Sequence, residues 1–246
     1  YNNFFKRPEV GFPKFKSKKK HNYSYTTNNQ GGNIYVSDRY IKLPKIGLVR
    51  VKKHRDFEGL IKFVTVSQTP SGKYYVSVLV KQEDKDKLPI TNNKIGIDLG
   101  IKEFCITSNG EMIENPKYFR KSEKRLRKLQ KDLSRCEKGS KNREKCRIKV
   151  AKQHEKITNQ RKDFLHKESR QITNAWDCVC IEDLDLKEIA GKEHHGKSVS
   201  DTGWGMFTTF LSYKLQEAGK RLIRVDRYYP SSQLCSECGY QNKETK

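Results

Sequence analysis

The chain has 246 residues, and its 52 lysines and arginines outnumber its 29 acidic residues to give a formal net charge of +23. A surplus of this size opposes a compact fold through self-repulsion, so we expect a polyanionic partner, most simply nucleic acid. The sequence contains no long apolar run and no signal-peptide pattern, which argues against a membrane protein. A ribosomal-type or simply soluble basic protein is the alternative.

The cysteine content indicates a reducing compartment. The number of cysteines is odd, and their spacing is not that of a small disulfide scaffold. The chain begins at Tyr1 and not at Met, and it ends soon after a Cys-x-x-Cys pair, so we expect a piece of a longer protein. The seven cysteines are Cys105, Cys136, Cys146, Cys178, Cys180, Cys235 and Cys238.

Residues 1 to about 45 are predicted to be rich in loops. Within them, residues 11–20 interleave aromatic side chains with lysines, a pattern that suits phosphate contacts combined with base stacking. A solvated basic tail explains the same pattern. The candidate nucleic-acid contacts in this stretch are Lys14, Lys16 and Lys18.

Three strands are expected next, at residues 48–52, 60–66 and 74–80, from their apolar alternation. The turn sequence Pro70-Ser71-Gly72 separates the second strand from the third, which predicts a small antiparallel sheet or barrel. Residues 81–89 are charged and polar, and they are predicted to be a linker. The basic candidates where the first strand ends are Arg50, Lys52, Lys53 and Arg55.

A second unit begins at Lys94. Residues 94–99 and 104–108 are predicted strands, and Asn109-Gly110 signals a hairpin that returns through residues 112–113. Residues 117–175 are predicted to form two helices that break at residues 139–140, with apolar residues at helical spacing. Their other faces are dense in lysine and arginine, which favours a nucleic-acid cradle over a merely solvated surface. The candidates there are Arg120, Arg125, Arg127, Lys128, Arg161 and Lys167.

The last third of the chain returns to strands. Residues 177–184 are a predicted strand, residues 191–205 are expected to be polar and mobile, and residues 206–218 form a helix that ends at Gly219. Residues 221–226 are a further strand. Strands that alternate with helices in this way are typical of a layered α/β fold.

Two acids lie at the ends of apolar strands. Asp98 follows Ile97, and Glu182 follows Ile181. A buried carboxylate is costly without a compensating cation. If neighbouring strands present both acids at one edge of a sheet, they could hold Mg²⁺ or Mn²⁺ and support phosphodiester cleavage. The alternative is that Asp98 caps a turn and Glu182 pairs with a lysine.

Other polar residues are weaker candidates for this site. Asp183 would point to the opposite face of the strand from Glu182. Asp185 and Asp226 lie near strand ends and could support the two acids. The histidines, among them His194 and His195, lack the spacing of metal ligands and are expected to be structural or exposed to solvent.

Near the end of the sequence, Cys235 and Cys238 are followed by Gly239. The Cys-x-x-Cys spacing lets both thiolates reach one tetrahedral Zn²⁺, and a second ligand pair would have to lie beyond Lys246. A redox Cys-x-x-Cys is the alternative. Cys178 and Cys180 share one face of a predicted buried strand and are expected to belong to the core.

Together, these motifs resemble TnpB, the OrfB-type RNA-guided nuclease of insertion sequences, and its relatives, the miniature type V CRISPR effectors. The resemblance covers nearly the whole chain, with several separate motifs in the same order. They are Gly11-Phe12-Pro13-Lys14-Phe15-Lys16-Ser17-Lys18, Leu43-Pro44-Lys45-Ile46-Gly47, Gly96-Ile97-Asp98-Leu99-Gly100, Ile181-Glu182-Asp183-Leu184, Gly203-Trp204-Gly205-Met206-Phe207, and Val225-Asp226-Arg227-Tyr228-Tyr229-Pro230-Ser231-Ser232-Gln233 before Cys235 and Cys238.

The resemblance implies three regions. Residues 1–88 would be the later part of a wedge domain, which is an oligonucleotide-binding β-barrel. Residues 94–234 would be a RuvC-like nuclease domain of the RNase H fold, and residues 235–246 would begin a zinc-ribbon insert that binds the target nucleic acid. The fold class implied is therefore α/β plus β.

The resemblance also implies a function. Asp98 and Glu182 would be the first and second catalytic acids of a Mg²⁺- or Mn²⁺-dependent DNA endonuclease, and Cys235 and Cys238 would bind Zn²⁺. The partners would be a guide RNA and a target double-stranded DNA in a prokaryotic cytoplasm. Further nucleic-acid contacts would come from Ser231, Ser232 and Gln233.

The chain departs from the family pattern in two ways. The third catalytic acid, which the family carries after its second zinc pair, has no counterpart, and the helical insert that precedes the wedge strands is absent. The alternatives are a nuclease-inactive RNA-guided repressor, a miniature type V CRISPR effector, or an unguided RNase H-type nuclease or strand transferase. The sequence does not set the guide, the target-adjacent motif, the host or the oligomeric state.

Overall fold

A computed structural model describes residues 2–7, 9, 11–12, 23–83, 87, 89–191, 196–227, 229–230, 233–234 and 238–242. The chain divides into two compact units, Tyr1–Asp84 and Lys85–Lys246, which we treat separately. No helix among the described residues is long and apolar enough to cross a bilayer.

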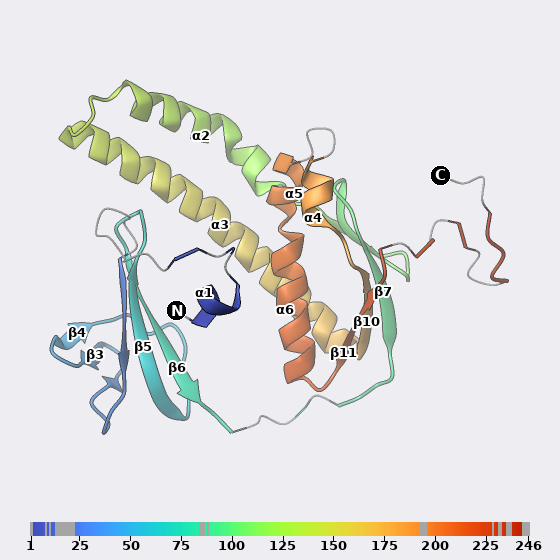
Figure 1. The fold of residues 1–246 in the computed structure, drawn as a ribbon, viewed down its shortest axis with the longest axis horizontal. Helices are drawn as coiled ribbons and strands as arrows, with labels where there is room; N and C mark the ends of the chain where they lie inside the picture. Colours follow the sequence, from blue (N-terminus) through green and yellow to red (C-terminus); the bar gives the residue numbers. More distant parts are fainter. Residues whose placement is uncertain are drawn as a thin grey trace. The chain divides into compact units, whose positions relative to one another are not determined.

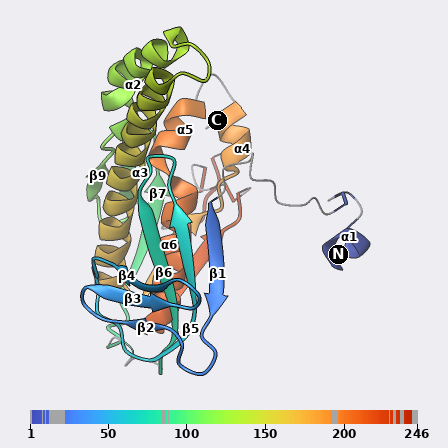
Figure 2. The same ribbon diagram turned by 90° about the vertical axis from the view of Figure 1, so that its left-hand side faces the viewer.

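The first unit contains two three-stranded antiparallel sheets (Figures 1 and 2). In one sheet the order is β1-β5-β6, and in the other it is β2-β3-β4. A small core of four buried residues, Ile34, Ile41, Leu43 and Val64, joins them. The elements of this unit are α1 (Asn2–Lys6), β1 (Ser24–Asn28), β2 (Tyr35–Val36), β3 (Tyr40–Leu43), β4 (Gly47–Arg50), β5 (Leu60–Gln68) and β6 (Tyr74–Lys81).

The predicted strands of this unit are present as β4, β5 and β6, but the prediction of a loop-rich region up to about residue 45 missed several short elements. That region also contains α1, β1, β2 and β3. The sequence of β1, Ser24–Asn28, is polar and largely exposed, so it lacks the apolar alternation that marks a strand. Each residue of β1 pairs with one of residues 63–67 of β5. This pairing, and not the sequence of β1 itself, holds the segment as a strand.

The second unit is built on a five-stranded mixed sheet with the order β11-β10-β7-β8-β9. The central strand β7 pairs in parallel with β10, and β10 pairs in parallel with β11. On the other side of β7, β8 and β9 continue as an antiparallel hairpin. The strands are β7 (Lys94–Leu99), β8 (Glu103–Thr107), β9 (Met112–Glu114), β10 (Cys178–Glu182) and β11 (Arg221–Val225).

Helices connect these strands and cover one face of the sheet, as the α/β pattern predicted. Helices α3 and α6 lie on the same side of the sheet, and α2 runs back along α3 as an antiparallel hairpin (Figure 1). The core between sheet and helices includes Ile97, Val179, Leu165, Phe207 and Leu211, each at most 5 % exposed. The helices are α2 (Tyr118–Arg135), α3 (Lys141–Ala175), α4 (Leu186–Gly191), α5 (Gly196–Thr202) and α6 (Trp204–Glu217).

The expectation that residues 191–205 are polar and mobile needs a correction, because residues 196–202 form α5. Asp201 on this helix is buried, and its carboxylate accepts hydrogen bonds from the backbone N–H groups of Phe119 and Arg120 at 2.9–3.3 Å. It also pairs with Arg161 of α3 at 3.2 Å. Asp201 therefore caps the N-terminus of α2, whose own N-cap residue Lys117 makes no side-chain cap bond.

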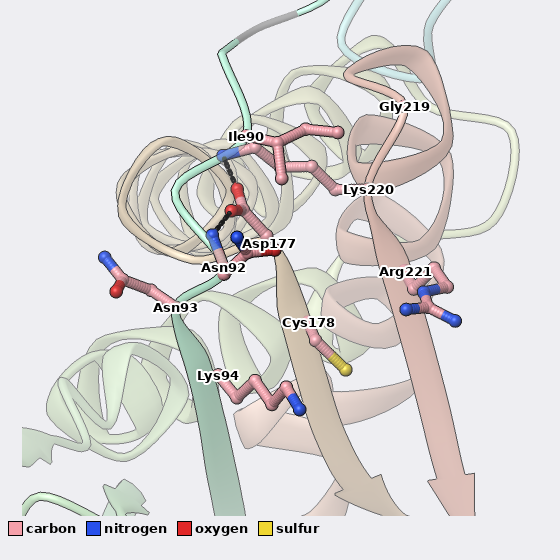
Figure 3. Close-up of a pocket in the computed structure, with 9 residues that line it drawn as sticks. All are labelled: Ile90, Asn92, Asn93, Lys94, Asp177, Cys178, Gly219, Lys220 and Arg221. Carbon is pink, nitrogen blue, oxygen red and sulfur yellow. Dashed lines mark hydrogen bonds and ion pairs between the residues drawn. The ribbon is translucent and has the colours of Figure 1, made fainter.

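The N-terminal ends of the parallel strands are held by a buried ion pair. Asp177 lies between Asn92 and Lys220 (Figure 3), with its Oδ1 atom 3.1 Å from Lys220 Nζ. Its Oδ2 atom accepts hydrogen bonds from the backbone N–H groups of Thr91 and Asn92. Burial raises the pKa of the Asp177 carboxyl, but these hydrogen bonds outweigh it, so the pKa lies below its ordinary value. This cluster fastens the segment that enters β7 to the start of β10.

Candidate functional site

The structure brings the two acids singled out in the sequence to neighbouring strands. Ile97 of β7 pairs with Ile181 of β10 in the parallel ladder, and Asp98 and Glu182 are the next residue of each strand. Because the two strands run parallel in constant register, both carboxylates lie at the same edge of the sheet and on the same face. The arrangement predicted for Asp98 and Glu182 is therefore present.

The surroundings of the pair differ from the expectation of buried carboxylates. Ile95, Ile97 and Leu99 point toward the helices, whereas Asp98 between them is exposed on the other face, and Glu182 is exposed as well. The costly burial that the apolar runs suggested does not arise, because alternation turns both acids away from the core. Across the sheet, Asp98 is flanked by Ile106 and Glu182 by Val225.

Two glycines shape the strand that carries Asp98. Gly96 lies on the same face as Asp98, and the backbone N–H of Gly96 donates to Ser108 Oγ at 3.1 Å. Gly100 follows the strand, where a Cβ atom would come within 3.0 Å of the carbonyl oxygen of Glu103. A larger residue at position 100 would crowd this carbonyl, so glycine suits the tight turn that leads into β8.

The buried Cys105 thiol of β8 lies within the influence of several carboxylates. Burial, with smaller contributions from the charges of Glu168, Glu111 and Asp98, raises the pKa of the Cys105 thiol to about 12. Burial also raises the pKa of Glu168, and the charge of Glu111 adds to this. At neutral pH the Cys105 thiol therefore stays protonated.

A cavity of about 260 Å³ lies beside Glu182, between the end of β10 and the first turns of α6. The Trp204 indole that lines it is 3 % exposed, and its Nε1–H finds no hydrogen-bond partner among the described residues. Trp204, Thr208, Thr209 and Arg224 were missed as site residues, although Gly203-Trp204-Gly205 belongs to one of the sequence motifs. The polar and aromatic lining residues are Glu182, Asp183, Trp204, Thr208, Thr209 and Arg224.

The weaker acidic candidates have other partners. Asp183 pairs with Arg224 at 3.3 Å, and Asp185 pairs with Arg227 at 3.1 Å. Asp226 follows the last residue of β11. Within the described ranges, no group of three or more histidine, cysteine, aspartate or glutamate side chains could hold one metal ion. Among the described residues, Asp98 and Glu182 are therefore not part of a larger group of such side chains.

The basic candidates of the second unit fall into two groups. Arg125 and Lys128 are exposed on α2, as is Arg127, which pairs with Glu123 at 2.7 Å. Arg120 donates to Ser198 Oγ, and Lys167 pairs with Asp163 on the exposed face of α3. Arg161 differs, because its side chain is 16 % exposed and bound to Asp201. This corrects its assignment as a surface contact for nucleic acid.

In the first unit, Arg50 and Lys52 are exposed at and just beyond the end of β4, as is Arg55. Lys53 forms ion pairs with Asp38 at 3.0 Å and with Asp56 at 2.6 Å. Hydrogen bonds to Asp56 and Asp38 raise the pKa of Lys53. Lys53 is thus already paired with acidic side chains of the same unit. Lys14, Lys16 and Lys18 lie outside the described residues, as do Ser231 and Ser232.

Of the proposed zinc ligands, Cys238 is described, exposed and free, whereas Cys235 lies outside the described residues. An isolated antiparallel bridge joins Leu234 to Gln241, and Gln241 Nε2 donates to Gln233 Oε1 at 3.0 Å. An antiparallel bridge between two positions this close in sequence requires the chain to reverse between them. Gly239, with φ of 70°, supplies the left-handed backbone that such a turn needs.

Comparison with known proteins gives consistent matches. Residues 77–193 match the family model OrfB_IS605, described as a probable transposase, and residues 204–246 match the Cas12f1-like TNB domain. A putative RNA-guided DNA endonuclease of Streptomyces pristinaespiralis is 41 % identical over 176 residues, which is 72 % of this chain and 44 % of that protein. The putative RNA-guided DNA endonuclease InsQ of Escherichia coli (strain K12) is 31 % identical over 262 residues, which is 100 % of this chain and 64 % of InsQ.

Among solved structures, the Cas12f1 protein of a Cas12f1–sgRNA–target DNA complex has a TM-score of 0.61 and 15 % sequence identity, over 100 % of this chain and 62 % of that one. This likeness shows that the two proteins share a fold. The chain therefore spans between 44 % and 64 % of the length of these three proteins. The resemblance to TnpB proteins is confirmed: residues 77–193 match the OrfB_IS605 family model, and residues 204–246 match the Cas12f1-like TNB domain model.

Proposed function

We propose that this chain is the wedge and nuclease part of an RNA-guided DNA endonuclease, and that Asp98 and Glu182 are two of its metal-binding carboxylates. The observation that carries the proposal is the alignment of these two acids at the ends of adjacent parallel strands. The names of the Streptomyces and Escherichia relatives support the same activity. The likeness to Cas12f1 supports the RuvC-like, RNase H-type reading of the five-stranded sheet.

The acid pair suits Mg²⁺ or Mn²⁺. Both ions prefer oxygen ligands, and Mg²⁺ keeps several waters when only one or two carboxylates hold it, so an exposed pair of acids suits it. When bound, the metal would supply an activated water and charge stabilisation for phosphodiester hydrolysis. Asp98 and Glu182 would hold the ion, and the strand pairing would fix the separation of the two carboxylates.

Binding of the nucleic acids would fall to basic surfaces in both units. The exposed side chains of Arg125 and Lys128 on α2 suit contacts with phosphates, which are sequence-independent. In the first unit, Arg50, Lys52 and Arg55 are similarly exposed. The proposed partners are a guide RNA and target double-stranded DNA, with base pairing between them reading the sequence.

We further propose that the first unit is an oligonucleotide-binding wedge domain and that Cys235 and Cys238 begin a zinc ribbon. The two antiparallel sheets that share a core support the first assignment. The bridge between Leu234 and Gln241, with the left-handed Gly239, supports the second. Zinc needs four ligands, so the remaining pair would come from another part of the full-length protein.

The test uses the full-length protein purified with the RNA that accompanies it. It is incubated with plasmids that carry matching targets, in Mg²⁺ or in EDTA. We expect linear plasmid in the reactions with Mg²⁺ and none in those with EDTA. The variants Asp98→Asn and Glu182→Gln should each lose at least about 100-fold in cleavage rate. The matched control is Asp163→Asn, an exposed acid on α3, which should cut normally.

Three results would contradict the proposal. RNA-dependent retention of plasmid without cutting under any metal condition would identify a binding-only repressor. Cleavage that survives removal of the RNA would identify an unguided nuclease. Normal cleavage by both acid variants would place the catalytic site elsewhere in the protein.

A further inference from the structure

Two cysteines meet at the tip of the α2–α3 hairpin. Cys136 is the C-cap residue that follows α2, and Cys146 lies in the second turn of α3. The Cys136 thiol donates toward the Cys146 sulfur, with the two Sγ atoms 3.6 Å apart, and it also donates to the carbonyl oxygen of Asp132 at 3.3 Å. Both side chains are only partly buried, so small molecules can reach them.

The backbone around the pair is fixed by several hydrogen bonds. The Arg143 guanidinium donates to the carbonyl oxygens of Leu133 at 2.9 Å and Cys136 at 3.1 Å, which joins the end of α2 to the start of α3. Ser140 Oγ caps α3 by accepting from the Arg143 N–H at 3.1 Å. Gly139 makes the reversal with φ of 86°. The two sulfurs are therefore held near each other by the hairpin and not by chance rotamers.

The geometry points to a redox function for this pair: we propose that Cys136 and Cys146 form a reversible disulfide that locks the hairpin tip when the chain meets a low-molecular-weight disulfide oxidant. Closing the bond requires the sulfurs to approach from 3.6 Å to about 2.05 Å, which side-chain rotation can supply. The hairpin tip is rich in lysine and arginine, so it attracts an anionic oxidant such as glutathione disulfide. The hydrogen bond to Cys146, and then burial, raise the pKa of the Cys136 thiol, so Cys146 is the first nucleophile of the pair.

The chemistry is a thiol–disulfide exchange in two steps. The Cys146 thiolate, toward which the neighbouring thiol donates, attacks one sulfur of glutathione disulfide and releases one glutathione thiolate. Cys136 then loses its proton to solvent and attacks the Cys146 sulfur of the mixed disulfide, which releases the second glutathione thiolate. The two cysteines together lose two electrons and two protons, and glutathione disulfide is reduced to two glutathiones.

The other described cysteines are less suited to this reaction. Cys105 is fully buried, and burial raises the pKa of its thiol to about 12. Cys178 and Cys180 are two residues apart on one strand. Successive same-face positions of an extended strand lie about 6.6–6.8 Å apart, at the upper limit of the Cα separation that a disulfide bridges.

The test is peptide mapping of the full chain after oxidation. The reduced protein is treated with glutathione disulfide, quenched with acid, alkylated with N-ethylmaleimide and digested with trypsin, which cuts at Lys138 and Arg143 between the two cysteines. We expect one linked species that contains Cys136 and Cys146 and separates when reductant is added. The rate at which this species forms should exceed the rate for any other cysteine pair by about tenfold or more.

Single variants define the order of events. In Cys136→Ser, a glutathione adduct should accumulate on Cys146, because the second thiol is missing. In Cys180→Ser, the matched control, the Cys136–Cys146 link should form at the normal rate. The proposal is overturned if Cys136 and Cys146 both stay reduced, and so react with N-ethylmaleimide, while Cys238 is oxidised. It is also overturned if the disulfide joins two chains.

Discussion

Asp98 and Glu182 extend the same line of paired residues, one position beyond Ile97 and Ile181 of the parallel strands β7 and β10. The two acids are therefore held side by side by backbone hydrogen bonds of the sheet, whatever their charges. Like charges on paired positions of neighbouring strands destabilise a sheet. Two acids at these positions therefore lower the stability of the sheet. Such a local loss of stability is expected at functional sites.

This relationship predicts a link between metal binding and stability. In EDTA, Asp98→Asn or Glu182→Gln should raise the free energy of unfolding by about 0.2–1 kcal/mol, since each removes the repulsion between the acids. Adding Mg²⁺ should stabilise the wild-type protein but neither variant, because binding to the folded state alone raises its stability. Urea unfolding curves at fixed ionic strength, with Asp163→Asn as the control, measure both effects. Equal stabilisation of all four proteins by Mg²⁺ would mean that the ion binds elsewhere.

A second prediction concerns the exposed basic face of α2. Replacing Arg125 and Lys128 with glutamine should weaken binding to duplex nucleic acid of any sequence. The salt dependence of binding should flatten by about 0.9 in log–log slope for each phosphate that the variant no longer neutralises. The variant Arg125→Lys with Lys128→Arg keeps both charges and serves as the control. Binding titrations at several salt concentrations give the slope. An unchanged slope in the glutamine variant would remove this face from the proposed nucleic-acid surface.

Much of the second unit follows from its sequence, because each element carries its own signal. Residues 94–99 form the predicted strand with the same bounds, and the two helices break at residues 139–140 as predicted. The sequence predicts that Asp98 and Glu182 lie close together only if their two strands are assumed to be neighbours in the sheet. The register that aligns them comes from tertiary pairing, which no local pattern encodes.

The missed elements depend on contacts with distant residues. Helix α5 has the sequence Gly-Lys-Ser-Val-Ser-Asp-Thr, whose glycine, serines and aspartate favour caps and turns over a helix interior. It is held in the fold by Asp201, which reaches the N-terminus of α2 some 80 residues earlier in the chain. The cavity beside Glu182 is likewise formed by α6 and β10 together. The sequence around Thr208 and Trp204 therefore does not predict that they line a cavity.

Asp201 gives a third prediction. Its side chain is 3 % exposed, and it pairs with Arg161, which is 16 % exposed, so removing the carboxylate leaves a buried guanidinium without its anion. We expect Asp201→Asn to lower the free energy of unfolding by about 3 kcal/mol. Asp163→Asn breaks an exposed pair with Lys167 and should cost at most about 0.5 kcal/mol. Chemical denaturation of both variants tests the difference, and similar small losses would show that Asp201 is not a structural anchor.

Asp177 predicts how the stability of the second unit depends on pH. Because the pKa of its carboxyl is lower in the folded state than in the unfolded chain, the unfolded chain binds more protons in acid. The stability that Asp177 contributes is thus present above its ordinary pKa of about 3.9, and it is lost as the pH falls through the lower folded-state value. Wild type should exceed Asp177→Asn in stability at pH 7, and the gap should shrink steadily below about pH 4. Denaturation midpoints measured from pH 7 to pH 2 give this gap directly. A gap that stays constant over that range would show that Lys220 and the backbone N–H groups of Thr91 and Asn92 do not depend on the charge of Asp177.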